Sequence, residues 1–341
     1  MKELIHITDR EEARRNLREY NKRNPIDLFM VESDVMLDAL VFANKLSQFN
    51  SNVLILGDSG VGKEALAKYI HCQSDRRKGP FMAINCSAIP GNLFESEVFG
   101  YEKGGFTGAD KTKAGLFEEA QDGTIFLDEI GELPEDQQPK LLRFLESKSL
   151  IRIGGNKVFN SNARIICATN ANMCEKIEKK EFREDLYYRI STAEINIPPL
   201  RERKADIEPL LYLFLDKLNK QYALNKQFTR EALDALKKRT YPGNVREVRN
   251  VVERMMINST SDFMTASDIE WRKHWAGNSL SSDDNIKIRR LVPLEEAIKE
   301  LERKLLQMGS DMGMSSRELA KVLEVNQSTI IRKLNMYKIK K

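Results

Sequence analysis

Short apolar runs alternate with amphipathic segments through the first part of the chain. Five runs of four or five residues are rich in β-branched or aromatic side chains, and they cover residues 52–56, 81–85, 124–127, 164–168 and 193–197. Apolar runs with helical patterns between them are typical of parallel strands that are buried on both faces. The pattern therefore predicts an α/β subdomain over residues 25–200, with a parallel sheet flanked by helices.

The period of the pattern changes after about residue 205, where apolar positions recur every three or four residues. Two amphipathic helices are indicated by Leu210, Leu211, Phe214 and Leu218, and then by Ala232, Leu233 and Leu236. No further strand is expected there. Residues 201–273 are therefore predicted to form a helical subdomain.

The segment before the sheet is too short for a domain. Residues 1–24 predict a short strand at Leu4–Ile7, followed by a charged helix that begins near Thr8 or Asp9. We expect this segment to act as a linker or signalling helix.

The end of the chain has a pattern of its own. The small, polar residues 277–284 indicate a linker within 274–292, and Pro293 opens a final helical stretch. This predicts a small all-α domain over residues 293–341.

Composition narrows the class of protein. The chain has 341 residues with 41% hydrophobic and 31% charged, and no apolar run reaches 18 residues. We therefore expect a cytoplasmic protein with no membrane partner. Its four cysteines lack metal-ligand spacing and are predicted to be reduced, buried side chains. With only three histidines, a histidine-based metal site or catalytic triad is not expected.

Positive charge is concentrated at the C-terminus. The segment from Lys287 to Lys341 holds 13 Lys and Arg against 7 Asp and Glu, a net +6, whereas the whole chain has a net charge of +4. A basic tail on a nearly neutral body suggests a polyanion-binding module, although a solvated charged surface would also explain it.

The sequence GDSGVGKE follows the first apolar run and precedes a helical stretch that starts at Lys63. This strand–loop–helix context is the one a phosphate-binding P-loop requires, because backbone N–H groups and a helix N-terminus surround the anion. The predicted ATP-binding residues are Gly57, Asp58, Ser59, Gly60, Val61, Gly62, Lys63 and Glu64. The last position normally carries the Ser or Thr that binds magnesium, so Glu64 departs from the general motif.

A second acidic motif, GTIFLDE, ends the third apolar run. Asp128 and Glu129 would lie at the carboxyl end of a sheet strand, facing the phosphates. Asp128 is the expected ligand of Mg²⁺, and Glu129 the base that orients the attacking water. The alternative is that the pair only caps the helix that follows.

Three further segments carry groups that could sense the γ-phosphate. The run RIICATN ends in Thr169 and Asn170, which would place an amide beside the water. Arg183 and Arg189, in FREDLYYRI, could reach a neighbouring subunit's nucleotide as arginine fingers, or simply pair with adjacent carboxylates. Arg246, in YPGNVREV, could contact the phosphates from the helical subdomain.

A glycine-rich hexapeptide lies between the P-loop and the acidic pair. It consists of Gly104, Gly105, Phe106, Thr107, Gly108 and Ala109, a composition that favours neither helix nor strand. One interpretation is a mobile loop that presents Phe106 to a partner. The other is an ordinary turn with Phe106 folded into the core.

The C-terminal segment from Ser315 to Tyr337 has the pattern of a helix-turn-helix. Ser315 and Glu318 form a possible capping box, and a turn at Glu324 precedes Asn326 as the cap of a second helix. The predicted inward side chains are Leu319, Val322, Leu323, Ile330, Ile331 and Leu334. The predicted DNA-facing side chains are Gln327, Ser328, Thr329, Arg332 and Lys333. A plain helical hairpin with a basic surface is the alternative.

The motifs occur together in the order and spacing of a known family. GDSGVGKE, GGFTGA, GTIFLDE, ATN, FREDLYYRI, PPLRER and YPGNVRE resemble, from about Val31 to Lys273, the sigma-54-dependent transcription activators of the AAA+ ATPase superfamily. The resemblance implies a ring, usually a hexamer, with ATP and Mg²⁺ at subunit interfaces. It also implies that Glu64 is an ordinary variant of the P-loop.

The same resemblance assigns roles to single residues. It implies that Asn85 is a switch that restrains Glu129, that Thr169 and Asn170 form the first sensor, and that Arg246 is the second. Arg183 and Arg189 match the arginine fingers. Residues 104–109 match the loop usually written GAFTGA, which contacts sigma-54; Gly105 replaces its alanine and is expected to add backbone freedom.

The resulting hypothesis is an ATP-hydrolysing, DNA-binding activator that remodels sigma-54 RNA polymerase through residues 104–109. The C-terminal segment is similar to a TyrR-type helix-turn-helix, which predicts dimeric binding to double-stranded DNA. One alternative is a TyrR-like regulator that never engages sigma-54, although the intact Phe106-Thr107 pair favours the activator. A general AAA+ chaperone fits poorly with the helix-turn-helix. Because the N-terminal segment faintly resembles the end of a PAS domain, we expect a longer sensor protein.

Overall fold

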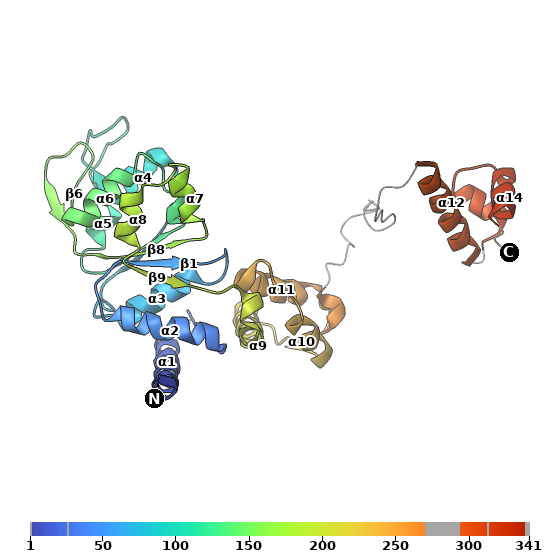
Figure 1. Ribbon diagram of the computed structural model, residues 1–341, viewed down its shortest axis with the longest axis horizontal. Coiled ribbons are helices and arrows are strands. Elements are labelled where there is room, and N and C mark those ends of the chain that lie inside the picture. The colour runs from blue at the N-terminus through green and yellow to red at the C-terminus, as the bar shows by residue number, and fades with distance from the viewer. Residues whose placement is uncertain (1, 26, 270–293, 312–313, 338–341) are drawn as a thin grey trace. The chain divides into compact units, whose positions relative to one another are not determined.

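The computed structural model describes residues 2–25, 27–269, 294–311 and 314–337, and it falls into two compact units, residues 1–272 and 273–341 (Figure 1). Each unit is described by itself. The predicted linker at 277–284 and Pro293 lie outside the described residues. No helix among the described residues is long and apolar enough to cross a membrane.

A five-stranded parallel sheet forms the centre of the first unit. Its strands are β1 (Val53–Leu56), β2 (Phe81–Asn85), β5 (Thr124–Asp128), β8 (Arg164–Thr169) and β9 (Ala193–Asn196), in the order β2-β5-β8-β1-β9. All neighbouring strands run parallel. The five predicted strands are therefore confirmed, with ends that differ by no more than one residue, and the fold is α/β.

Helices cover both faces of this sheet (Figure 1). One face carries α1 (Lys2–Arg23), α2 (Asp34–Ser47) and α3 (Lys63–Gln73). The other carries α4 (Gly91–Phe99), α5 (Leu116–Glu119), α6 (Gln138–Ser147), α7 (Met173–Glu178) and α8 (Glu184–Ile190). Successive strand residues point to opposite faces, so Val53 and Ile55 join the first core while Leu54 joins the second. Two layers of helices on an apolar sheet bury every central strand.

The N-terminal segment differs from its prediction. Residues 2–23 form one continuous helix, α1, so the strand expected at Leu4–Ile7 is wrong. Ala13, Leu17 and Tyr20 recur at helical spacing and are buried in the core against α2 and α3. A lone strand needs a partner strand for its hydrogen bonds, whereas a helix satisfies them internally.

The helical subdomain continues the same unit after β9. It contains the short 3-10 turns η2 (Leu200–Glu202), η3 (Lys204–Asp206) and η4 (Ala266–Asp268), and the helices α9 (Ile207–Tyr222), α10 (Arg230–Lys237) and α11 (Asn244–Asn258). Its own core unites these helices. The expectation of no strands is wrong in one detail: β10 (Gln227–Phe228) and β11 (Phe263–Met264) form a two-residue parallel pair.

Two small hairpins project from the sheet on the side of α4 and α6. The first pairs β3 (Gly100–Tyr101) with β4 (Lys113–Ala114) and carries residues 104–109. The second pairs β6 (Ser149–Ile151) with β7 (Val158–Asn160). They are joined by hydrogen bonds from Glu102 N to Ile153 O (3.0 Å) and from Ile153 N to Gly100 O (2.9 Å). The two hairpins therefore form one continuous structure.

The C-terminal unit is a three-helix module with α12 (Leu294–Asp311), α13 (Ser316–Val322) and α14 (Gln327–Met336). The capping box between Ser315 and Glu318 is confirmed, and Glu324 adopts a left-handed φ of 52° in the turn. Leu306, Leu319, Ala320 and Ile330 form its small core.

Two inward predictions for this module are wrong. Val322 is 61% exposed and Ile331 is 45% exposed. The buried residues of α13 are Ser316, Leu319 and Ala320. Val322 is the last residue of this helix, and the small core leaves it exposed although it follows Leu319 by three residues. Ile331 follows the buried Ile330 directly, and adjacent residues of a helix point about 100° apart.

Candidate nucleotide-binding and ATPase site

The loop between β1 and α3 has the backbone geometry that its glycines predict. Gly60 and Gly62 have φ values of 76° and 106°, in the left-handed region that favours glycine. A Cβ at Gly60 would lie 2.6 Å from the carbonyl oxygen of Gly243, so the lid backbone closely approaches the loop there. The helix begins at Lys63, as predicted.

Lys63 is held inside the site rather than in solvent. Its side chain is 6% exposed, and its Nζ donates to Gly57 O at 3.0 Å and lies 3.5 Å from Glu129 Oε1. Glu64, by contrast, faces outward and pairs with Lys68 one turn later (3.1 Å). The P-loop lysine and the predicted catalytic base are therefore neighbours, although 66 residues separate them in the chain.

The acidic pair occupies the carboxyl end of β5, as the sequence predicts. Asp128 lies beside Asn85 of β2 in the sheet register, and Glu129 follows with a left-handed φ of 52°. Burial, together with the charge of Glu129, raises the pKa of Asp128. Glu129 precedes a 3-10 turn, η1 (Ile130–Glu132), but its side chain makes no capping hydrogen bond there. The interpretation as a simple helix cap is therefore not supported.

Strand β8 adds a third contact to this centre. The backbone N–H of Asn170 donates to Glu129 Oε2 at 3.2 Å, while the side chain of Asn170 lines an open cavity. Thr169 is buried, and its Oγ1 accepts from Ala171 N. Glu129 is thus held between Lys63 and the end of β8.

Asn85 does not contact Glu129 in this structure. Its Oδ1 accepts hydrogen bonds from Ser87 N (2.9 Å) and Ser87 Oγ (2.7 Å). The side chain therefore closes a local turn after β2, and its role as a switch stays a prediction.

The start of helix α11 lies directly against the P-loop. Arg246 Nη1 donates to Ser59 Oγ (3.0 Å), Asn244 Nδ2 donates to Ser59 O (3.0 Å), and Val245 N donates to Gly60 O (2.9 Å). The structure thus brings the predicted lid arginine to the P-loop. Asn244 is a contact that sequence reasoning missed, and only its position two residues before Arg246 gave a signal.

Two arginines of the PPLRER segment also reach the loop, and neither was predicted. Arg201 pairs with Asp58 (3.3 Å), and the buried Arg203 donates to Val61 O (2.5 Å) and lies 3.6 Å from Asp206. Asp206 in turn accepts from the backbone N–H of Ser33 (2.7 Å). This network ties the lid, the P-loop and the segment before α2 together.

The two predicted arginine fingers, Arg183 just before helix α8 and Arg189 in its last turn, lie away from these contacts. Arg183 is exposed and makes two hydrogen bonds to Asp185 (3.0 and 2.7 Å), and Arg189 donates to Leu145 O (3.3 Å). Among the described residues, neither forms a hydrogen bond or ion pair with the P-loop. Their role across a subunit interface therefore stays a prediction.

The hexapeptide presents its aromatic side chain to solvent. Phe106 is 41% exposed and packs edge-on against Tyr101, with ring centroids 5.0 Å apart, so it does not belong to the core. Gly104 N donates to Ala109 O (2.9 Å), which closes the loop at its base, and Thr107 and Gly108 are exposed at its tip.

The structure gives a steric reason for glycine at position 105, which differs from the predicted one. Its φ is not in the left-handed region, and a Cβ there would lie 2.6 Å from Ile153 O of the second hairpin. Glycine thus permits a close approach of two backbones, and the added backbone freedom stays a prediction.

The predicted DNA-facing residues are only partly free. On α14, Gln327, Ser328 and Arg332 are exposed, whereas Thr329 is half-buried. Lys333 does not face outward as expected, because it forms an ion pair with Glu302 of α12. Glu302 also accepts from Tyr337 Oη (2.9 Å), which fixes the end of α14.

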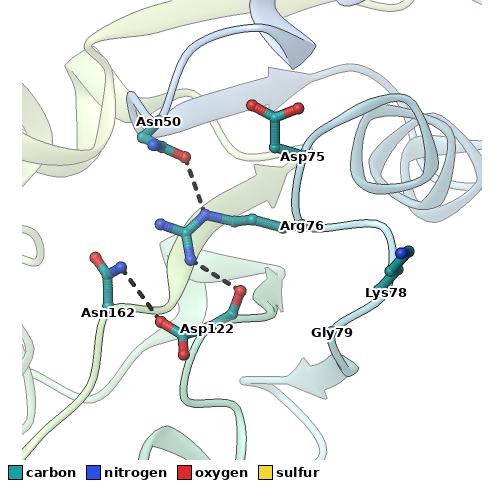
Figure 2. Close-up of a pocket in the computed structure, with 7 residues that line it drawn as sticks. All are labelled: Asn50, Asp75, Arg76, Lys78, Gly79, Asp122 and Asn162. Atoms are coloured by element: carbon teal, nitrogen blue, oxygen red, sulfur yellow. Dashed lines mark hydrogen bonds between the residues drawn. The ribbon is translucent and has the colours of Figure 1, made fainter.

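A second hollow lies at the amino edge of the sheet, opposite the P-loop (Figure 2). Arg76 bridges Asn50 Oδ1 and Asp122 O, both at 2.9 Å, and Asn162 donates to Asp122 (3.3 Å). The guanidinium of Arg76 at the centre of this hollow is thus hydrogen-bonded to partners within the chain.

In the described part of the chain, no group of three or more His, Cys, Asp and Glu could hold a metal ion. Of the four cysteines, Cys86 and Cys167 are buried as expected, whereas Cys72 is half-buried and Cys174 is exposed.

A parallel sheet, a P-loop after β1, an acidic pair at the end of β5 and a helical lid define a P-loop ATPase of the AAA+ type. Residues 29–196 match the sigma-54 interaction domain, and residues 201–283 match the AAA+ ATPase lid domain. The transcriptional regulatory protein FlgR of Helicobacter pylori is 45% identical over 261 residues, which are 74% of this chain and 68% of FlgR. The chain belongs to the sigma-54-dependent activators, a family of AAA+ ATPases.

Other relatives agree with this family. The Nif-specific regulatory protein of Azospirillum lipoferum is 46% identical over 235 residues, 69% of this chain and 38% of that protein. The crystal structure of NtrX from Brucella abortus in complex with ATP has a TM-score of 0.68 and 30% identity, and covers 91% of this chain and 69% of NtrX. The chain spans about two fifths of the length of the Nif-specific regulators that it matches.

Proposed function

We propose that this protein is an ATP-driven transcription activator that binds double-stranded DNA and remodels sigma-54 RNA polymerase. The observation that carries the proposal is the exposed Phe106, on a closed glycine-rich loop of an AAA+ ATPase whose family model is a sigma-54 interaction domain. ATP supplies the energy, the loop contacts sigma-54, and the C-terminal module binds DNA.

The P-loop residues 57–64 and Arg246 are proposed to bind ATP. Loop N–H groups and the N-terminus of α3 favour the phosphates, and Lys63 is placed to turn from Gly57 O toward them. Binding of ATP by NtrX, a relative of the same fold, supports this assignment.

Asp128 suits a magnesium ion bound together with the nucleotide. Carboxylate oxygens are hard ligands of the kind Mg²⁺ prefers, and this ion is usually held by one or two carboxylates plus phosphates. The raised pKa of Asp128 reflects burial of a negative charge beside a second carboxylate, which a cation would relieve. When bound, Mg²⁺ would neutralise charge on the phosphates.

Glu129 is proposed to take the proton of the attacking water. In this structure its carboxylate is engaged by Lys63 and by the N–H of Asn170. Nucleotide binding would draw Lys63 to the phosphates and release one carboxylate oxygen for water. The Asn170 side chain, at the cavity, would help to orient that water.

Assembly into a homo-oligomeric ring, with six subunits as is usual in the family, would complete the site. Arg183 and Arg189 are proposed as arginine fingers that enter a neighbouring subunit's site, where they stabilise charge on the transferring phosphoryl group. Their exposure on α8 supports this, since neither is buried within its own chain.

The C-terminal module is proposed to read DNA with the first half of α14. Gln327, Ser328 and Arg332 are exposed for base or phosphate contacts, with Thr329 beside them. Because Lys333 is paired with Glu302, we assign it a weaker role. The competing function is a TyrR-like regulator that does not contact sigma-54. That function gives no role to the exposed side chain of Phe106.

Replacing Phe106 by Ala tests the proposal. The variant is compared with Phe49→Ala, which removes a phenylalanine that is also exposed (60%) but lies outside the loop. ATP hydrolysis, DNA binding and open-complex formation with sigma-54 polymerase are measured for both. We expect near-normal hydrolysis and DNA binding in both variants, and loss of open complexes in Phe106→Ala alone.

Full activation by Phe106→Ala would contradict the assignment of the loop. A Glu129→Ala variant should bind ATP without turnover, which separates a failure of chemistry from a failure of the loop. A protein that binds DNA and hydrolyses ATP but never yields open complexes, even with Phe106 intact, would favour the TyrR-like function.

A further inference from the structure

Gln138 is the first residue of helix α6, and its side chain is fully buried. Its amide bonds three backbone groups: Nε2 donates to Leu133 O (3.1 Å) and to Glu181 O (2.9 Å), and Oε1 accepts from Arg183 N (2.8 Å). These are three of the four hydrogen bonds that a glutamine amide can make. None of the three partners belongs to α6, so the bonds do not serve the helix that carries Gln138.

The first partner, Leu133, ends the turn that follows the proposed catalytic base. Glu129 is the N-cap of the 3-10 turn η1, and Leu133 closes that turn, because its N–H donates to Ile130 O (3.1 Å). Leu133 is itself buried. Gln138 is therefore attached to the short turn whose other end holds Glu129.

The other two partners flank the start of α8. Glu181 O and Arg183 N lie on either side of Phe182, which is buried, and Arg183 is the N-cap of α8. The guanidinium of Arg183 is exposed, and it bonds Asp185 two residues further on. The backbone of Arg183 is thus anchored by a buried amide while its charged group remains at the surface. A residue that must reach out of its own subunit needs this arrangement, because a small misplacement costs much of its effect.

Helix α6 holds the second predicted finger as well. Arg189 Nη2 donates to Leu145 O (3.3 Å), and Leu145 lies seven residues after Gln138 in α6. Seven residues are close to two turns of an α-helix, so Gln138 and Leu145 lie on the same side of α6. The side of α6 that carries Gln138 therefore bonds both arginines.

We propose that Gln138 is a positioning residue for the arginine finger Arg183. In the proposed ring each subunit keeps Glu129 for its own ATP and lends Arg183 to a neighbour. Gln138 fixes the backbone of this finger relative to the turn that follows Glu129. The inference rests on the proposed role of Arg183 as a finger, and not on the sigma-54 step or on DNA binding.

Gln138→Met tests this role in the full chain, with Gln137→Met as the matched control. Gln137 is also buried, but its Nε2 bonds the adjacent Asp136 (2.7 Å) and its Oε1 makes no hydrogen bond within the described part of the chain. Because an arginine finger accounts for roughly 10³- to 10⁵-fold of the rate, its displacement in Gln138→Met should lower kcat about tenfold or more. ATP affinity should stay within about twofold of wild type, since the P-loop is unchanged. The Gln137 variant should match wild type in both.

Mixed rings distinguish a defect in the finger from a defect in the subunit's own site. Glu129→Ala subunits lack the base but keep Arg183. Mixed with Gln138→Met, they should raise hydrolysis several-fold above the summed activities of the two separate proteins. Mixing Gln138→Met with Arg183→Ala should restore nothing, because neither protein has a working finger. Restoration by Arg183→Ala would assign Gln138 to Glu129 of its own subunit and overturn the proposal, and so would restoration by neither partner.

The mixture of Glu129→Ala with Arg183→Ala tests the finger itself. Without restoration in this mixture, Arg183 is not a finger and its proposed function fails. With restoration there but none for Gln138→Met, only the role of Gln138 fails. These assays omit polymerase and DNA, so a failure of the sigma-54 function affects none of them.

Hydrogen exchange of the wild-type protein adds a measurement that needs no variant. The N–H of Arg183 should exchange at least about tenfold more slowly than an unprotected amide, because Gln138 accepts its hydrogen bond. Unprotected exchange at Arg183 would overturn the proposal, even if Gln138→Met does not fold.

Discussion

Asp128 and Glu129 are adjacent carboxylates in different environments. Asp128 ends β5 and is partly buried with a raised pKa, whereas Glu129 turns through a left-handed φ toward Lys63. A raised pKa in the folded protein means that the charged form is disfavoured there. Asp128 therefore contributes stability that is lost as pH rises through its folded pKa, and its charge at pH 7 is a cost that the nucleotide site retains.

The variant Asp128→Asn should change thermal stability and ATP hydrolysis in opposite directions. We expect a higher Tm for the variant without nucleotide, because a neutral amide of similar shape replaces a disfavoured charge. We also expect ATP hydrolysis to fall about 100-fold or more, since the proposed Mg²⁺ ion would lose its carboxylate ligand. Thermal unfolding without nucleotide and steady-state ATPase rates check both parts. A lower Tm for this variant would show instead that the carboxylate stabilises the folded protein.

At the scale of single elements, the second hairpin supports the hairpin that carries Phe106. Arg152 on the second hairpin bonds Glu118 (2.7 Å) and Glu102 (2.9 Å), and Glu102 N bonds Ile153 O. Gly105 lies against the same carbonyl. The loop that carries Phe106 is therefore supported by a neighbouring hairpin, and its position depends on close backbone contact.

Gly105→Ala should loosen this support. The added Cβ would lie 2.6 Å from Ile153 O, closer than such contacts allow, so the hairpins must separate locally. Hydrogen exchange is expected to accelerate at least several-fold at the amides of Glu102 and Ile153. Exchange in β5 should remain unchanged and serves as the internal control. Unaltered exchange at Glu102 would mean that the loop accepts alanine without moving.

Two buried basic side chains, Arg164 and His71, bear on the stability of the whole molecule. Arg164 is 1% exposed, and its Nη2 donates to Leu46 O (2.8 Å), which ties β8 to the end of α2. Burial lowers its pKa to about 10. His71, also buried, lies 2.9 Å from Thr124 Oγ1, and its pKa is lowered by burial and then by the charge of Arg164. The folded protein thus favours a neutral His71.

Global stability should consequently fall in mild acid. Below the ordinary histidine pKa of about 6.5 the unfolded chain binds a proton that folded His71 resists, so stability is full above that pH and declines below it. One such proton changes the free energy of unfolding by at most about 1.4 kcal/mol per pH unit. Denaturation of His71→Gln between pH 7 and 5 should show a shallower decline, with pH 8 as the baseline. Parallel curves for both proteins would exclude His71 as the cause.

Much of the fold could be predicted because its signals are local. Each sheet strand is an apolar run buried on both faces, and the P-loop glycines occupy backbone angles that other residues avoid. The failures have local causes too. Leu4–Ile7 has strand-like residues but no partner strand, and Val322 and Ile331 are apolar residues that the small C-terminal core leaves exposed. Sequence propensity indicates strand-forming or apolar residues at these positions, but tertiary packing determines whether they form a strand or become buried.

The sequence by itself determined the family, the five strands and the residue types of the nucleotide site, because motif spacing and hydrophobic period are properties of the chain alone. Only the tertiary structure decided which distant groups meet. It brought Lys63 to Glu129, Asn244 and Arg246 to Ser59, and Gly105 to Ile153. These contacts join segments whose separation along the chain carries no signal, so they follow from how sheet, lid and hairpins pack.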